Sequence, residues 1–109
     1  LAYARSLKRL GVDVRVRALD AAAFTGRLNG YDYDMVLHHW LSTLSPGSEQ
    51  ILYWGCAAAK ENARWNFAGI CDLAIDKLAL SIAQSTTYEE LTARARALDA
   101  ALLAGHYMV

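Results

Sequence analysis

The sequence predicts an α/β domain, with a small mixed or parallel sheet, a βαβ unit and helices packed on the sheet. Residues 12–18 alternate strictly between apolar and polar, which is typical of a strand with one face in water. Residues 33–39 contain the continuous apolar run Met35–Leu37, which favours a strand covered on both faces, as in parallel sheets. A helix between these two strands would complete a right-handed βαβ unit.

In the first third of the chain, two helices are predicted from apolar spacing and from capping residues. Residues 1–10 carry apolar side chains at three-residue spacing, and Gly11 supplies a residue that ends such a helix. Asp20 is a good N-cap, because its carboxylate accepts hydrogen bonds from the first helical turn. The short helix that it begins should cover residues 21–28 and end before Gly30.

The middle of the chain gives weaker signals. Ser45-Pro46-Gly47 is read as a turn or as a helix start, with Ser45 capping and Pro46 in the first helical position. Residues 49–55 suit one or two helical turns. Residues 57–69 have mixed polarity and are expected to form a loop.

Two helices and a strand are expected toward the C-terminus. Asp72 should cap a helix that runs to about Gln84, and Thr87 followed by Glu90 is the pattern of a capping box. Residues 106–109 read as a third strand. The apolar seam of the last helix is predicted to consist of Tyr88, Leu91, Ala95, Leu98 and Leu102.

Length and composition indicate one globular domain over residues 1–109. Hydrophobic residues make up 55% of the chain and charged residues 20%. The 11 basic and 11 acidic residues balance, which argues against a nucleic-acid partner. No apolar run approaches the roughly 20 residues that a membrane span needs, so no direct membrane insertion is expected. Because the chain begins at Leu1 inside an expected helix, we interpret it as part of a longer protein.

The end of the second predicted strand is the candidate ligand site. In α/β sheets ligands bind at the carboxyl ends of strands, which points to residues 40–45. Trp40 and Trp54 flank a polar turn, and aromatic walls with a few polar groups are typical of a small-molecule or peptide cleft. The alternative is that the three tryptophans simply form core, in a structural or assembly domain without a cleft.

No motif in the chain predicts catalysis, a cofactor or a metal site. His38 and His39 are neighbours on a predicted strand, so they should point to opposite faces and could not chelate one ion together. Ser42, Thr43 and Ser45 supply hydroxyls without a nucleophile elbow. A small α/β hydrolase-like enzyme stays an alternative, and it requires a histidine within hydrogen-bond reach of one of these hydroxyls.

Cys56 and Cys71 are the only cysteines. In an oxidising compartment a disulfide between them would close a loop of a length that contributes roughly 3 kcal/mol. The alternative is a pair of unpaired, apolar cysteines, because the sequence does not fix the distance between them.

Several segments, in order, resemble the C-terminal lobe of family 5 extracellular solute-binding proteins. The first is LKRLGVDVRVRALDAAAFTGRLNGYDYDMVLHHW, beginning at Leu7. Residues 44–50, Tyr53-Trp54-Gly55 and residues 66–70 are similar to the oligopeptide and microcin C branch. The resemblance spans nearly all 109 residues.

This resemblance implies transport without chemistry. Family members are the dipeptide- and oligopeptide-binding subunits of bacterial ABC importers, with a type II periplasmic-binding-protein fold whose two lobes close on the ligand. It implies a periplasmic protein, a peptide or peptide-like solute, a membrane permease as partner and no cofactor. The ligand-contacting segment would be Trp40, Leu41, Ser42 and Thr43, with Asn66 as a second candidate.

Thr43 departs from the family pattern. Peptide-binding relatives often carry an aspartate three residues after the tryptophan, where it pairs with the ammonium group of the peptide. A hydroxyl cannot supply a charge-assisted bond of that strength. The sequence therefore favours a blocked or modified peptide, or a non-peptide solute.

Overall fold

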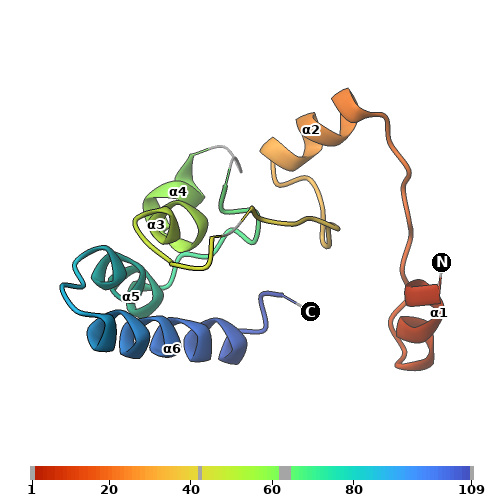
Figure 1. Cartoon of the computed structure of the whole chain (residues 1–109). Coiled ribbons are helices and arrows are strands. Elements are labelled where there is room, and N and C mark those ends of the chain that lie inside the picture. Colours follow the sequence, from red (N-terminus) through yellow and green to blue (C-terminus); the bar gives the residue numbers. More distant parts are fainter. Residues whose placement is uncertain (1, 42, 62–64, 109) are drawn as a thin grey trace.

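The computed structural model describes residues 2–41, 43–61 and 65–108, which contain six helices and no strand. Figure 1 shows these helices joined by irregular segments, with α1 set apart from the others at the N-terminal end. The helices are α1 (Ala2–Arg9), α2 (Ala21–Asn29), α3 (Glu49–Trp54), α4 (Cys56–Lys60), α5 (Leu73–Ala83) and α6 (Tyr88–Ala104). None of them is long and apolar enough to cross a membrane within the described residues.

The main core lies where α3, α5 and α6 pack together (Figure 1). Ala79 and Ile70 are at most 1% exposed, so small and branched side chains close the space between these helices. The buried members of this core are Tyr53, Trp54, Ile70, Ile75, Ala79, Ile82, Leu98 and Leu102. A smaller cluster of Leu28 and Phe67 lies beside it and receives Tyr31, Tyr33 and Val36.

The N-terminal part of the chain adds little to either core. Helix α1 buries no residue, and the segment from Gly11 to Leu19 is almost wholly exposed. The radius of gyration is 15.9 Å, whereas a compact domain of this length would have about 13 Å. The chain thus consists of a packed helical body and a loosely attached N-terminal arm (Figure 1).

The predicted α/β fold is wrong for the described residues, because none of the three expected strands forms. Residues 12–18, 33–39 and 106–108 run as irregular chain. A strand exists only through hydrogen bonds to a neighbouring strand, and no such ladder forms among the described residues. The expected burial of Met35–Leu37 on both faces is also wrong, since Met35 is 53% and Leu37 96% exposed.

The helix predictions for the termini are confirmed in place and in mechanism. Asp20 accepts a hydrogen bond from the backbone of Ala23 at 2.8 Å, and Asp72 accepts from Ala74 and Ile75. Gly11 follows α1 with a φ of +84°, the left-handed conformation that glycine adopts at helix ends.

The capping box of α6 forms in part. Thr87 Oγ1 accepts from the backbone N–H of Glu90 at 3.1 Å, but the Glu90 carboxylate accepts from Thr86 rather than from Thr87. The expected apolar seam is buried at Leu98 and Leu102. Its first member is the exception, because Tyr88 is 78% exposed.

The middle of the chain differs from expectation at two points. Helix α3 begins at Glu49 after Ser48, so Ser45 and Pro46 do not start a helix. Within the expected loop, residues up to Lys60 form α4.

Candidate ligand-binding site

Three consecutive backbone carbonyls, at residues 65–67, hold the segment that leads to the candidate site. Each carbonyl accepts a hydrogen bond from an aromatic side chain of residues 31–40. The pairs are Tyr31 Oη with Asn66 O at 2.7 Å, Tyr33 Oη with Phe67 O at 2.5 Å, and Trp40 Nε1 with Trp65 O at 2.9 Å. We call this set of three bonds the aromatic clasp.

The two phenols of the aromatic clasp are half-buried. Burial raises the pKa of Tyr31 and of Tyr33 above the ordinary value of 10.0, and the neighbouring Tyr31 raises that of Tyr33 further. Both phenols therefore keep the protons with which they bind the loop carbonyls. Gly69, which lies beside the Tyr31 ring, has a φ of +62°, a left-handed conformation that favours glycine.

Asn66 makes the hydrogen bonds that hold together the loop supplying these carbonyls. Its side chain is fully buried, with Nδ2 donating to Gly55 O at 3.1 Å and to Ile70 O at 2.8 Å. Its Oδ1 accepts from the Ile70 N–H at 3.0 Å. Every polar atom of this side chain is committed to the main chain, so we assign Asn66 to the framework rather than to the ligand contact predicted from the sequence.

Trp40 joins the two hydrophobic clusters and also belongs to the framework. It is half-buried, packs against both clusters, and its ring centroid lies 5.1 Å from that of Trp54 and 6.0 Å from that of Phe67. The indole N–H is used by the aromatic clasp. Trp40 thus fixes the point from which the next residues leave the body.

The residues after Trp40 face solvent. Leu41 is 84% exposed, and its carbonyl accepts from Tyr53 Oη at 3.0 Å. Thr43 is exposed, with its hydroxyl donating to Ser45 O at 2.7 Å, and Ser45 is exposed as well. Ser42 lies outside the described residues. Side-chain hydrogen bonds to the carbonyls of Leu41 and Ser45 therefore support this segment, and the side chains of Leu41 and Ser45 are exposed to solvent.

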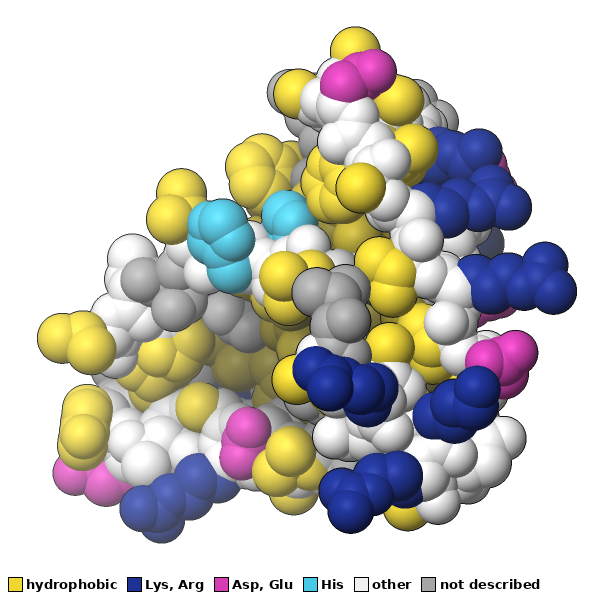
Figure 2. All heavy atoms as spheres, turned by 90° about the vertical axis from the view of Figure 1, so that its right-hand side faces the viewer, with side chains coloured by type: hydrophobic (Ala, Val, Ile, Leu, Met, Phe, Trp, Pro, Cys, Tyr) yellow, Lys and Arg dark blue, Asp and Glu magenta, His cyan; other side chains and the backbone are white. Residues whose placement is uncertain are grey.

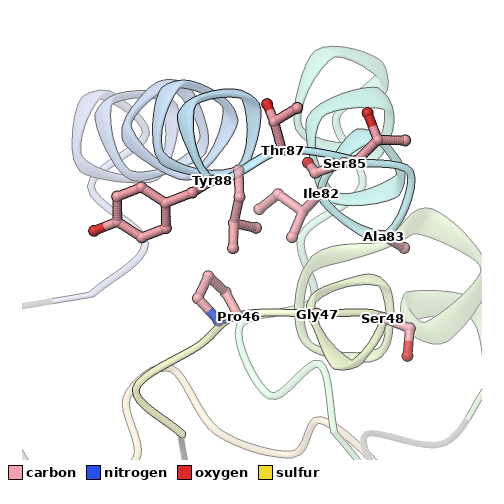
Figure 3. Close-up of a pocket in the computed structure, with 10 residues that line it drawn as sticks. Pro46, Gly47, Ser48, Ile82, Ala83, Ser85, Thr87 and Tyr88 are labelled. Carbon is pink, nitrogen blue, oxygen red and sulfur yellow. The ribbon is translucent and has the colours of Figure 1, made fainter.

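Two pockets that share lining residues lie beside this segment. Figure 3 shows the larger one, where Pro46 faces the turn between α5 and α6. The larger has a volume of about 480 Å³ and the smaller about 280 Å³. Both are lined by Pro46, Tyr88 and Leu91, and Ser45 lines the smaller one. Figure 3 shows hydroxyl side chains of Ser48, Ser85 and Thr87 around the larger pocket. Ser45 thus connects the candidate segment with a mixed apolar and hydroxyl surface.

His38 and His39 precede Trp40 in the sequence, whereas the candidate segment follows it. The His38 ring packs on Phe67, with centroids 3.8 Å apart, and meets the edge of Trp40. The His38 and His39 rings stack at 5.7 Å, so the expectation that they point to opposite faces is wrong. Figure 2 shows histidine side chains on the surface beside hydrophobic ones. Among the described residues, no hydrogen bond joins either histidine to a serine or threonine hydroxyl, and no three potential ligands gather around a metal position.

Acid should weaken the packing of His38. Burial, followed by the charge of His39, lowers its pKa below the ordinary value of 6.5. The unfolded chain therefore binds this proton more readily, and stability is full above pH 6.5 and falls as pH drops below that value. We expect urea midpoints to decrease between about pH 7 and pH 5.

The variant His38→Gln should flatten this pH dependence, while His106→Gln, at an exposed position, should leave it unchanged. An equal pH profile for wild type and His38→Gln would contradict the assignment.

Cys56 and Cys71 form a disulfide in the structure, with Cα atoms 4.2 Å apart. The bond joins the first residue of α4 to the residue just before the cap of α5. It thereby closes the loop that holds the carbonyls of the aromatic clasp. The backbone N–H of Cys56 also donates to Asp76 Oδ1 at 2.8 Å, which ties α4 to α5.

Sequence reasoning missed Tyr31, Tyr33 and Tyr53 as residues that position the site. Their only signal was an excess of aromatic side chains with polar tips around residues 31–54. Such side chains usually find a partner when they are partly buried, but the sequence does not say that the partners are carbonyls 12 positions away for Tyr53 and more than 30 positions away for Tyr31 and Tyr33.

Several bacterial proteins are similar to this chain over its whole length. An uncharacterized protein of Sinorhizobium fredii, y4wM, is 42% identical over 109 residues. The probable peptide-binding protein YejA and the peptidoglycan-binding protein YepA, both of Agrobacterium fabrum, are each 37% identical over 109 residues. No family model matches the chain.

The match covers all of this chain but only 16% to 18% of the length of these relatives. The chain is therefore similar to one segment of longer proteins, two of which are named for binding rather than for catalysis. These matches support the resemblance of the sequence to solute-binding proteins.

Proposed function

We propose that this chain is a segment of the C-terminal lobe of an extracytoplasmic solute-binding protein, and that it supplies part of a peptide-binding cleft. The observation that carries the proposal is the identity of 37% over the whole chain with a protein named as peptide-binding. The protein would act without catalysis and deliver its solute to the permease of an ABC importer. The disulfide between Cys56 and Cys71 is in keeping with an oxidising compartment such as the periplasm.

The cleft segment in this proposal runs from Trp40 to Ser45. Trp40 anchors it, and Leu41, Thr43 and Ser45 offer one aliphatic and two hydroxyl side chains to a solute. Ser42, which lies outside the described residues, belongs to the same proposed segment. The carbonyls of Leu41 and Ser45 are already hydrogen-bonded, which lowers the ordering entropy that binding through these two residues costs.

A structural role without any cleft is less well supported. That reading expects all three tryptophans to be inaccessible, whereas Trp54 is 7% but Trp65 46% exposed. The alternative of a hydrolase gains no support from the described residues, where His38 packs on Phe67 and no hydrogen bond joins His38 or His39 to the hydroxyl of Thr43 or Ser45.

The solute class follows from Thr43. Without a carboxylate at this position, an ammonium group would lose part of its hydration and gain only neutral acceptors. We therefore propose that the solute is a peptide with a blocked N-terminus. The stem peptide of a peptidoglycan fragment has such an acylated N-terminus, and one relative is named peptidoglycan-binding, so these fragments are a second candidate.

Titration of the full-length protein tests this proposal. We expect N-acetylated peptides or peptidoglycan stem peptides to bind more tightly than the same peptides with a free amine. The failure of every peptide and peptidoglycan fragment to bind would refute the proposed function.

The variant Thr43→Asp tests the role of the position itself. We expect it to favour free-amine peptides by roughly tenfold or more relative to acetylated ones, because a hydrogen bond to a charged group contributes about 1.5–3 kcal/mol. Ala93→Asp adds the same charge at an exposed position of α6 and is the matched control. Equal shifts for both variants would show that Thr43 does not face the peptide terminus.

A further inference from the structure

Trp65 has a hydrogen-bonded backbone carbonyl and a partly exposed ring. It is 46% exposed, in contrast to Trp54 at 7% and the half-buried Trp40. Tryptophan has a large apolar surface, and its burial dominates many interfaces. Single exposed apolar side chains are common and need no explanation, so the position of Trp65 matters more than its exposure.

Contacts through Trp40 and Tyr53 connect Trp65 to the proposed cleft segment. Its carbonyl accepts from the indole of Trp40 at 2.9 Å, and its ring packs against the Tyr53 ring at 6.3 Å. Tyr53 is itself buried and donates its hydroxyl to the carbonyl of Leu41 at 3.0 Å. Leu41 follows Trp40 directly in the chain. Leu41 and Trp65 therefore both contact the same buried residue, Tyr53.

This arrangement gives the ring of Trp65 a defined place before any ligand binds. The backbone of Trp65 is held by the aromatic clasp, and the next residue, Asn66, is locked by three hydrogen bonds. A pre-positioned aromatic ring loses little freedom when a second group stacks on it. Leu41, 84% exposed, adds an aliphatic surface tied to the same support.

We propose that Trp65 is a specificity-determining residue that contacts an aromatic or large aliphatic side chain of the bound peptide. The inference rests on the proposed function, because it assumes that residues 40–45 border the peptide. It assigns a role to a residue that the sequence placed only in a loop. The competing outcome is that another part of the longer protein covers the ring.

The test couples a variant of the full-length protein to a variant of the ligand. Phenylalanine is placed at each position of an N-acetylated alanine tetrapeptide in turn, and the peptides are titrated against wild type and Trp65→Ala. We expect Trp65→Ala to weaken one phenylalanine peptide about two- to twelvefold more than the all-alanine peptide, as aromatic pairs do.

Trp65→Phe should recover part of the preference, and it keeps a ring against Tyr53 if the alanine variant folds poorly. Leu73→Ala, at a position that is 74% exposed beyond the loop, is the control and should leave the preference intact. If Trp65→Ala weakens all peptides equally, or weakens none of them, the assignment of Trp65 is overturned while the proposed function stands. Either result would indicate that the ring is covered by another part of the protein or has only a structural role. If wild type binds none of these peptides and no peptidoglycan fragment, the proposed function fails and this assignment fails with it.

Discussion

Asn66→Ala is expected to lower the free energy of unfolding by about 3 kcal/mol or more, because it leaves three buried backbone groups without a hydrogen-bond partner. The side chain serves the carbonyls of Gly55 and Ile70 and the N–H of Ile70, and it is 0% exposed. Each buried polar group that loses its partner costs roughly 1–3 kcal/mol. Urea unfolding followed by circular dichroism measures the change.

Asn29→Ala is the matched control, because Asn29 is exposed at the end of α2. It should change the unfolding free energy by less than about 0.5 kcal/mol. Asn66→Asp is a sharper variant, since it keeps the acceptor for Ile70 but turns a carboxylate oxygen toward two carbonyl oxygens. A stable Asn66→Asp protein would contradict the hydrogen-bond assignment.

Removal of the disulfide is expected to have an effect of similar size. Cys56 and Cys71 are separated by 15 positions, and closing a loop of this length stabilises a protein by about 3 kcal/mol in the chain-entropy account. The double variant Cys56→Ser/Cys71→Ser should therefore unfold at lower urea concentration than the oxidised wild type.

A reductant separates this effect from the loss of packing around sulfur. Dithiothreitol should shift the midpoint of the wild type toward that of the double variant and leave the variant unchanged. A wild-type midpoint that does not respond to the reductant, with both thiols shown to be free, would contradict a stabilising role for the bond.

Both variants act on the same loop and should therefore reach the proposed cleft. Asn66 lies between the two cysteines in sequence and supplies a carbonyl to the aromatic clasp. Loosening this loop would release Tyr31, Tyr33 and Trp40 from their acceptors. The stability of the loop and the position of the residues after Trp40 are thus expected to change together.

The sequence was informative where a structure depends on near neighbours. Asp20, Asp72 and Thr87 were each predicted to cap a helix, and each accepts a hydrogen bond from a residue two or three positions ahead. Gly11 likewise ends α1 through its own backbone conformation. Leu41 and Thr43, after Trp40, are exposed, and their role as ligand contacts stays a prediction.

The sequence failed where a structure depends on a distant partner. The alternating residues 12–18 predict which face of a strand would be buried, but they do not supply the neighbouring strand that makes it a strand. The family resemblance implies Asn66 as a ligand contact, but the sequence does not show that its side chain is buried and hydrogen-bonded to Gly55 and Ile70.

The sequence by itself thus determined helices α1, α2, α5 and α6 and the residues that cap or end them, because capping and helical periodicity act over three or four residues. Tertiary structure alone decided which aromatic side chains support the site. The bonds of Tyr31 and Tyr33 to the loop carbonyls join residues 35 and 34 positions apart. A bond of that span is set by packing of the whole body, and no local pattern encodes it.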